Sequence, residues 1–370
     1  MISKYENTQI TSIWGDANKF ALMSSISKEY LELLSSCEDL NLNCELSSCV
    51  SLKEIKKRER ITKHETVAFL NEFESKMVDE KAKRFLHKNL TSSDLLDSTS
   101  TIMHKQSCTV LITLFNIFKT TLINLIETNQ GIYCIGRTHS KRAELIEFNN
   151  RFRLLLNTTT ELFESLQNSV KELPQKLSGP MGDSSGIPSI VQSNFSYVNK
   201  TNLSQHNMQI IPRFYYADIV FKIANLATCF EKFFTDIRIL ALDEVNEIQE
   251  GFSKGQAGSS AMPHKKNPIL SERICGLSRL LRSYVSMSLE NNISWFERDI
   301  SHSSTERLYW PDMWHIICYI VKMANNILND ISINYQSIEA NSSYAKTSRD
   351  KFNIKRETLP YSKAHEEASK

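Results

Sequence analysis

Apolar residues spaced as on one face of a helix dominate this chain. They recur every three or four positions from about Ile102 to Asn129, which is the period of an amphipathic helix. The same spacing predicts four more long helices, at about Leu145–Leu173, Ala217–Ile248, Ile269–Leu289 and Pro311–Ile333. Helices of this length bury more apolar surface than one chain's short connections can cover. We therefore predict an all-α bundle completed by other subunits, and no strand-rich segment competes with this pattern.

Glycines mark the breaks between these helices. Six of the ten glycines lie in two short stretches, residues 179–186 and 251–258. Because glycine lowers the barrier to backbone rearrangement, both stretches are predicted to be loops.

Composition sets the class of protein. With 370 residues the chain could hold two or three domains. Its 41% hydrophobic and 23% charged residues are typical of a soluble globular protein, and a net charge of +2 makes no general case for nucleic-acid or membrane binding. No apolar run approaches the length of a membrane span, and residues 1–6 lack the apolar core of a signal peptide, so we expect a cytoplasmic protein. The eight cysteines form no C-x-x-C pair, which makes disulfides and structural zinc improbable and predicts reduced, mostly buried thiols.

The stretch Gly258–Asn267 does not follow the helical pattern. It offers the hydroxyls of Ser259 and Ser260, the positive charge of Lys265 and the amide of Asn267 within one short segment. These groups suit the chemistry of anions, so we predict a mobile catalytic loop.

Three further stretches carry polar groups that could have either a functional or a purely structural role. His139 lies beside a guanidinium in Gly136-Arg137-Thr138-His139-Ser140, although a lone histidine is more often structural than catalytic. His64 precedes an amphipathic run and could simply start a helix. Thr91 and Ser92 have the residue types of a helix N-cap, and free amides at a helix start also bind carboxylates and phosphates.

The block from Trp295 to Arg307 combines two arginines with four hydroxyls. Surface arginines are usually only solvated, but a cluster of this density would suit a phosphate or a dicarboxylate.

Taken in order, these stretches resemble those of one family. The chain reads T-x-H-[DE], L-T-S-[ST]-D, G-R-T-H, S-G-x-x-G, G-S-S-A-M-P-H-K-[KR]-N-P and W-x-E-R-D-I-S-H-S-S-x-E-R. This order resembles the adenylosuccinate lyases of the fumarase/aspartase superfamily, and the resemblance covers nearly the whole chain from Ile13 onward. Within the superfamily, His264 and the block 297–307 favour this family over fumarase, aspartase and argininosuccinate lyase.

The resemblance implies a fold and an assembly. It implies a fumarase/aspartase-like fold of three mostly helical domains, which we place at residues 1–101, at 102–340 with the signature loop 251–268, and at 341–370 for a third domain that is incomplete. The central domain would hold the bundle of five long helices. Four chains would form a homotetramer in which each active site draws on three chains.

The resemblance also implies a reaction and the residues that perform it. Fumarate would be eliminated from adenylosuccinate, giving AMP, and from a succinylated aminoimidazole carboxamide ribotide, without metal or organic cofactor. Ser259 would be the base and His139 the general acid, while Lys265 would hold the succinyl carboxylate and Glu272 would orient a histidine. The substrate-binding positions would be Lys4, Tyr5, His64, Thr91, Ser92, Gln209, Asn267, Arg298, Ser303 and Arg307, with the last three best placed for the phosphate.

Lys4 and Asn7 are departures from the family, which usually has arginines near these places. Part of the binding site for the phosphate is therefore expected to be weakened or rebuilt.

Two alternatives stay open from the sequence. Another lyase or cycloisomerase of the superfamily would keep Ser259 and Lys265 without a nucleotide phosphate site, so AMP binding distinguishes it. A non-catalytic helical scaffold would have no reason to carry Ser259 and His139 together, and an assay of fumarate release distinguishes that case.

Overall fold

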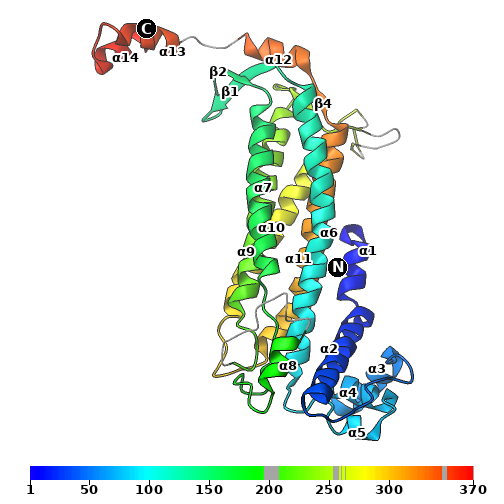
Figure 1. Ribbon diagram of the computed structural model, residues 1–370. Coiled ribbons are helices and arrows are strands. Elements are labelled where there is room, and N and C mark those ends of the chain that lie inside the picture. Colours follow the sequence, from blue (N-terminus) through cyan, green and yellow to red (C-terminus); the bar gives the residue numbers. More distant parts are fainter. Residues whose placement is uncertain (196–207, 253–257, 260, 263, 344–347, 370) are drawn as a thin grey trace. The chain divides into compact units, whose positions relative to one another are not determined.

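The computed structural model describes residues 1–195, 208–252, 258–259, 261–262, 264–343 and 348–369, and most of these residues are helical (Figure 1). Five long helices follow one another along the middle of the chain, namely α6 (Ser92–Thr128), α7 (Asn150–Lys171), α9 (Phe214–Leu240), α10 (Ile269–Glu290) and α11 (Ser301–Asp330). The other helices are η1 (Ser3–Tyr5), α1 (Thr8–Trp14), α2 (Asp16–Cys37), α3 (Leu52–Thr62), α4 (Glu65–Lys76), α5 (Glu80–Lys83), α8 (Ser189–Asn194), α12 (Tyr335–Ser342), α13 (Ser348–Arg356) and α14 (Tyr361–Ser369). The strands are β1 (Tyr133–Thr138), β2 (Lys141–Glu147), β3 (Ile248–Gln249) and β4 (Ser332–Ile333). The predicted helical fold with five long helices is confirmed.

Two of the long helices begin ten residues earlier than their apolar spacing predicts. Helix α6 begins at Ser92 rather than at Ile102, because its first turns bury polar side chains such as Asp94, which conceal the apolar period. Helix α11 begins at Ser301 and continues through Pro311. Proline favours the first turn of a helix, where its missing N–H matters least, so its place in the helix interior was not predicted.

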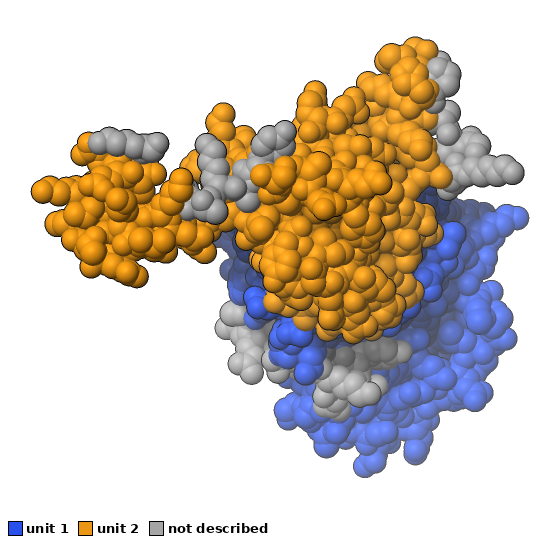
Figure 2. Space-filling model, turned by 90° about the horizontal axis from the view of Figure 1, so that it is seen from above, with its two compact units in different colours: residues 1–115, 161–227, 277–321 blue, residues 116–160, 228–276, 322–370 orange. Residues whose placement is uncertain are grey.

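The contacts divide the chain into two compact units, which Figure 2 colours separately. Unit 1 comprises residues 1–115, 161–227 and 277–321, and unit 2 comprises residues 116–160, 228–276 and 322–370. Their boundaries fall inside the five long helices, so each of these helices contributes residues to both units. The three domains expected from the sequence are a different division of the chain and stay a prediction.

Aromatic contacts join neighbouring long helices within each unit. In unit 1, the ring of Phe115 on α6 stacks on Phe163 of α7 with the centroids 4.1 Å apart. In unit 2, Phe118 of α6 meets Phe230 of α9 edge to face at 5.2 Å. Such pairs add about 0.5–1.5 kcal/mol to the free energy gained by burial, so the predicted apolar faces do form the cores.

Unit 2 also contains a β-hairpin that the sequence did not predict. Strand β1 pairs antiparallel with β2, and a bulge lies between Ile135 and Arg137. Strand β1 buries three successive residues, Cys134, Ile135 and Gly136, so no alternation of polar and apolar residues identifies it. No strand was predicted here. Strand β2 takes up the first residues of the helix predicted from about Leu145, which is why α7 begins only at Asn150.

Helix α6 is long and apolar enough to cross a membrane by length and composition, contrary to the expectation that no such segment exists. Its first turns carry Asp94 and Asp97, which form buried ion pairs inside unit 1. Only 22% of its most apolar 18-residue window is buried within this chain. Among the residues of α6, all of which the structure describes, Ile117 is nevertheless the only large apolar side chain that is exposed, and the exposed positions around it are polar, such as Thr113 and Asn116.

Candidate active site

A cavity of about 300 Å³ in unit 1 collects three of the predicted substrate-binding residues, Arg298, Ser303 and Arg307. Trp14 and Trp310 are among its apolar lining residues, and the other charged residues that line it are Asp16, Lys19, Glu65, Asp97, Arg213 and Glu306. Its volume is at the lower end of the range for small-molecule sites. The cavity therefore suits part of a nucleotide, and cations and anions both face it.

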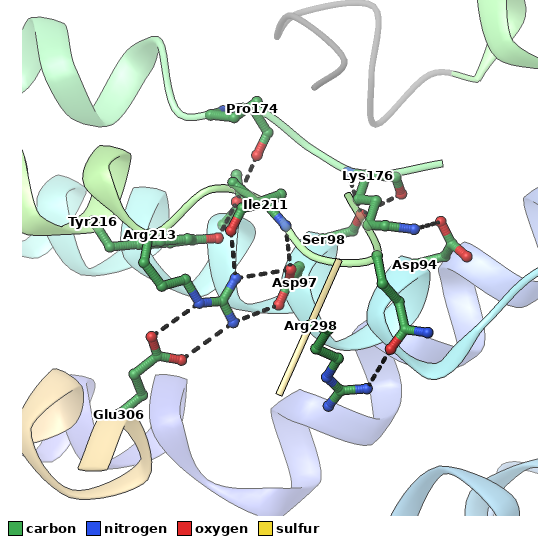
Figure 3. Close-up of polar contacts among 12 residues, drawn as sticks. Asp94, Asp97, Ser98, Pro174, Lys176, Ile211, Arg213, Tyr216, Arg298 and Glu306 are labelled. Carbon is green, nitrogen blue, oxygen red and sulfur yellow. Dashed lines mark hydrogen bonds and ion pairs between the residues drawn. The ribbon is translucent and has the colours of Figure 1, made fainter. Parts of the chain in front are cut away.

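Arg298 lines this cavity with part of its guanidinium unpaired. Its Nη1 donates to Oε1 of Gln209 at 2.8 Å, and Arg298 is labelled in Figure 3. Its Nε is buried and has no hydrogen-bond partner in the described part of the chain. The Nε and Nη2 edge of a guanidinium can donate two parallel hydrogen bonds to a phosphate or carboxylate. The structure thus brings Gln209 and Arg298 together and leaves an oxyanion-binding edge on Arg298.

Ser303 and Arg307 lie one turn apart near the start of α11, on the same helix face. The helix start is fixed by Asp299, whose Oδ1 accepts the backbone N–H of Ser301 at 2.7 Å and the Ser301 hydroxyl. These hydrogen bonds hold the pKa of Asp299 well below its usual range. The Arg307 side chain is mostly exposed, with Nη2 3.8 Å from Oε2 of Glu65, so its guanidinium is free to meet a ligand.

A buried triad of Asp97, Arg213 and Glu306 forms one wall of the cavity (Figure 3). Arg213 donates from Nη1 and Nη2 to the two oxygens of Asp97 at 2.9 and 3.0 Å. Its Nε and Nη2 donate to the two oxygens of Glu306 at 3.0 and 3.2 Å. The triad joins α6, the start of α9 and α11 at one point, which fixes the helix that carries Ser303 and Arg307.

Burial and charge shift the pKa values of the groups in and around the triad in different directions. Burial raises the pKa of Glu306 to about 7, against the opposing charge of Arg213. For Asp97 the charge and hydrogen bonds of Arg213 outweigh burial and hold the pKa below its usual range. Burial, with repulsion from Arg213, lowers the pKa of His302 to about 4, so this imidazole is neutral at pH 7.

A second buried network leads from α6 to Gln209. Oδ1 of Asp94 accepts Nζ of Lys176 at 2.7 Å and the N–H groups of Ser178 and Gly179 at 2.8 and 3.2 Å. This carboxylate therefore fixes the start of the predicted glycine loop. Two residues of the network, Asp94 and Lys176, are labelled in Figure 3.

The same glycine loop then contacts the neighbourhood of Arg298. The carbonyl of Pro180 accepts Nε2 of Gln209 at 3.1 Å. At Gly182, φ is +77°, and a Cβ would lie 2.2 Å from the carbonyl oxygen of Met208. Only glycine allows this close approach, which places Gln209 against the loop.

Three predicted residues begin helices in unit 1. His64 is the N-cap of α4, with its Nδ1 accepting the N–H of Val67 at 3.4 Å. Thr91 and Ser92 lie at the start of α6, where the Thr91 N–H donates to Oδ2 of Asp94 at 2.7 Å. These contacts agree with the helix-start interpretation of all three residues, and their substrate-binding role stays a prediction.

Lys4 and Tyr5 lie away from the lining of this cavity. Both belong to η1, and Lys4 is exposed. The ring of Tyr5 meets Tyr319 edge to face at 5.0 Å and lines a separate groove with Leu280. Within one chain they are therefore not brought to the Arg298 cavity.

In unit 2, the described part of the signature loop holds Ser259 between backbone donors. Its Oγ accepts the N–H groups of Ala261 and Met262 at 3.3 and 3.1 Å. Hydrogen bonds from backbone N–H groups stabilise negative charge on the oxygen that accepts them. Ser260, the other candidate hydroxyl, lies outside the described residues.

The rest of the loop folds back on its own start. Nδ2 of Asn267 donates to the carbonyl of Gly258 at 3.0 Å, and a Cβ on Gly258 would lie 2.1 Å from the carbonyl oxygen of Lys265. Lys265 itself is exposed. The loop thus places Ser259, Lys265 and Asn267 in one short, tightly turned segment.

A buried carboxylate that the sequence analysis missed fixes the end of this loop. Oε1 of Glu250 accepts the N–H of Ser271 at 2.6 Å, and its Oε2 accepts the N–H of Leu270 at 3.2 Å. These are free amides of the first turn of α10, so Glu250 caps that helix from outside it. Glu272 lies in the same first turn and is exposed.

His139 occupies the tip of the hairpin. Thr138 pairs with Lys141, so His139 and Ser140 form a two-residue turn, with φ of +50° and +61°. Positive φ at both central residues matches the twist of a hairpin. The His139 side chain is exposed, which leaves its imidazole available to a group outside this chain.

A bidentate ion pair holds this hairpin close to its tip. Nη2 and Nη1 of Arg137 donate to the Glu247 carboxylate at 2.6 and 3.3 Å, and Glu247 is fully buried. Nδ2 of Asn341 on α12 also donates to Glu247, at 3.0 Å. The arginine beside His139 is therefore an anchor, and Glu247 is a second buried carboxylate that the sequence analysis missed.

Comparisons with known proteins identify the family of this chain. A family model described as lyase matches residues 39–281. The adenylosuccinate lyase of Thermotoga maritima is 32% identical over 347 residues, covering 92% of this chain and 80% of that protein. The adenylosuccinate lyase of Aquifex aeolicus is 31% identical over 354 residues, covering 94% and 80%. This chain belongs to the adenylosuccinate lyase family. As a member of that family it is a carbon–nitrogen lyase.

Solved structures share the fold of this family member. The fumarate lyase from Mesorhizobium sp. BNC1 has a TM-score of 0.80 at 15% identity, covering 99% of this chain and 85% of that chain. The 3-carboxy-cis,cis-muconate lactonizing enzyme from Pseudomonas putida has a TM-score of 0.83 at 16% identity, with the same coverage. At these identities the likeness concerns the fold alone.

Sequence reasoning missed the buried charges that position the site. Glu306 stood inside a motif that was recognised, and Asp94 ended another, but neither was given a role. Arg213 carried one signal, because it is an isolated charge between Pro212 and a run of aromatic residues. A charge in such a place is buried only when it is paired.

Proposed function

We propose that this enzyme eliminates fumarate from adenylosuccinate, giving AMP, and from succinylaminoimidazole carboxamide ribotide, giving the free carboxamide, as a cytoplasmic enzyme of purine biosynthesis. Three features support the proposal: relatives named adenylosuccinate lyase, a cavity with an unpaired arginine edge, and a serine held by backbone donors. A nucleotide phosphate and a succinyl group are both anionic. The residues of the cavity and those of the signature loop offer hydrogen-bond donors for both.

The environment of Ser259 is the observation that carries the mechanism. Elimination requires a base that removes a proton from the carbon next to a carboxylate. A serine hydroxyl is a poor base until it is deprotonated. The N–H groups of Ala261 and Met262 that donate to its Oγ would stabilise the alkoxide. We therefore assign proton abstraction to Ser259, and the Lys265 ammonium would add positive charge nearby.

Lys265 and Asn267 of the loop are assigned to bind the succinyl carboxylate of the substrate, on which the negative charge develops. One N–H of the Asn267 amide donates a hydrogen bond to the carbonyl of Gly258. The same nitrogen carries a second N–H, which can donate to the substrate. Glu272, exposed in the first turn of α10, is assigned the orientation of the catalytic imidazole.

Protonation of the departing nitrogen is assigned to His139. An imidazole can supply a proton near neutral pH. The hairpin that carries His139 is anchored by the Arg137–Glu247 pair, so its tip is held although its side chain is exposed. Arg298, Ser303 and Arg307 are assigned to the nucleotide phosphate, with Gln209 orienting Arg298 through their hydrogen bond.

We further propose a homotetramer in which each active site draws on several chains. The exposed imidazole of His139 and the low burial of helix α6 within one chain support this assembly. Lys4 and Tyr5, which lie away from the Arg298 cavity of their own chain, would then reach the site of another chain. His64, Thr91 and Ser92 would contribute from the helix starts.

Complementation between two inactive variants tests function and assembly together. Ser259→Ala and His139→Gln tetramers should each release fumarate from adenylosuccinate at least about 10²-fold more slowly than the wild type, measured by ultraviolet absorbance. If the two residues of a site come from different chains, exchange of subunits in an equal mixture should restore about a quarter of the sites.

The matched control is the chain that carries both substitutions. Mixed with either single variant, it exchanges subunits in the same way but forms no site with both groups intact. Absence of fumarate release from the wild type would refute the proposed reaction. Proven hybrid tetramers without recovered activity would refute the shared site.

A further inference from the structure

The Asp97–Arg213–Glu306 triad contains more negative than positive charge. All five N–H bonds of Arg213 are used, four by the two carboxylates and one by the carbonyl of Ile211 at 2.8 Å. Two carboxylates and one guanidinium leave one negative charge when all are ionised. A buried charge without its own partner is unfavourable, so the triad favours binding one proton.

Glu306 is the member that receives this proton. Asp97 accepts three hydrogen bonds, two from Arg213 and one from the N–H of Ile211 at 2.7 Å. Among the residues that the structure describes, Glu306 accepts hydrogen bonds only from Arg213, and these are two. The pKa of Glu306 is raised to about 7 by burial, whereas that of Asp97 is held low by Arg213. Near neutral pH the triad therefore changes between neutral and singly negative.

This change of charge faces the cavity assigned to the phosphate. All three residues line the cavity together with Arg298 and Arg307. Arg213 cannot serve a ligand, because its donors are saturated. A phosphate dianion that enters meets the unpaired edge of Arg298 on a wall that also carries the extra negative charge of the triad.

The charged and titratable neighbours of Glu306 come from several elements. They are Asp97 of α6, Arg213 and Tyr216 at the start of α9, and His302 and Tyr309 of α11. Burial raises the pKa values of Tyr216 and Tyr309, and His302 is neutral, so none of these three changes charge near pH 7. Elsewhere in the cavity lining, Glu65 is paired with Lys19, and Asp16 is paired with Lys56.

We propose that Glu306 couples anion binding to proton uptake, so that a phosphate-monoester dianion enters the cavity while the Glu306 carboxylate takes one proton from solvent. The inference rests on the proposed nucleotide function and extends it. The proton neutralises the triad, which removes the repulsion that the dianion would otherwise meet. Affinity should then fall as pH rises above 7, by at most about tenfold per pH unit, the limit set by one proton.

Calorimetry of AMP binding to the full-chain protein tests this coupling. Titrations at pH 8, in buffers of different ionisation enthalpy, give the number of protons taken up per AMP. The phosphate of AMP is then already a dianion, since its second pKa is about 6. We expect the wild type to take up a fraction of a proton that Glu306→Gln does not. From pH 7 to 8.5 the Kd of the wild type should rise, whereas that of Glu306→Gln should stay nearly constant.

Two matched variants and two further probes define the outcome. Asp16→Asn also removes a carboxylate from the cavity lining, but an exposed, paired one, and should keep the proton uptake of the wild type. Glu306→Asp keeps a titratable carboxylate and should keep the coupling. Inorganic phosphate should bind more weakly with the same uptake, whereas adenosine, which lacks the dianion, should bind without it.

The possible failures are distinguishable. Equal proton uptake by the wild type and Glu306→Gln would overturn the inference, as would weaker binding by Glu306→Gln at every pH with an unchanged slope, which is the mark of a structural role. If Glu306→Gln does not fold, equal proton uptake by the wild type with AMP and with adenosine would overturn it instead. Absence of AMP binding and of fumarate release would remove the proposed function, and this inference with it.

Discussion

Replacing Arg298 by lysine tests whether the unpaired guanidinium edge binds the ligand phosphate. The substitution keeps one positive charge at the cavity, but a lysine ammonium cannot offer two parallel donors. It also cannot reproduce the geometry in which Nη1 holds Gln209 while Nε remains available. The variant therefore separates hydrogen-bond geometry from charge.

The expected magnitude follows from the number of bonds lost. If the ammonium makes one of the two bonds to the phosphate, one charge-assisted hydrogen bond is lost, worth about 1.5–3 kcal/mol. Since 1.4 kcal/mol corresponds to about a tenfold change, KM should rise by about 10- to 100-fold. The phosphate lies away from the reacting carbon, so its binding is equal in substrate and transition state and kcat should change little.

Steady-state fumarate release, followed by absorbance over a wide range of adenylosuccinate concentrations, gives the two constants separately. Arg60→Lys, at an exposed arginine in the last turn of α3, is the matched control and should leave both unchanged. A fall in kcat at constant KM would show that Arg298 acts on the reacting atoms and would refute its assignment to the phosphate.

Two further predictions concern the loop and the buried network. Gly258→Ala places a Cβ against the carbonyl of Lys265, so kcat should fall sharply while the melting temperature changes by little, and a normal kcat would show that the tight turn is not needed. Asp94→Asn breaks the buried pair with Lys176 and should destabilise the protein by about 3–5 kcal/mol, seen as a lower melting temperature by circular dichroism, whereas an unchanged melting temperature would contradict the importance of this pair.

The long helices were predictable because each carries its own evidence. Apolar residues repeat along α6, α7, α9, α10 and α11, and this period depends only on neighbouring positions. The hairpin was not predictable in this way, since β1 buries successive residues instead of alternating ones. Strand β2 alternates no better.

The buried charges were not predictable for a different reason. Asp97 and Arg213 are 116 residues apart, and Arg213 and Glu306 are 93 apart, so no local pattern records that they meet. Motifs did identify Arg298, Ser303 and Arg307, which the fold collects in one cavity. The proposed meeting of His139 and Ser259 is between copies of the chain, and a sequence carries no local pattern for such a contact.

The carboxylate of Glu250 has a consequence for how the signature loop can change. It binds the amides of residues 20 and 21 positions further along the chain, so the two ends of the loop are tied at a single point. The entropy of closing a loop grows only slowly with its length. Insertions or substitutions between the tied ends therefore change the reactive surface with little effect on the helices that support it. The Glu250 carboxylate thus separates the stability of the supporting helices from the sequence of the signature loop.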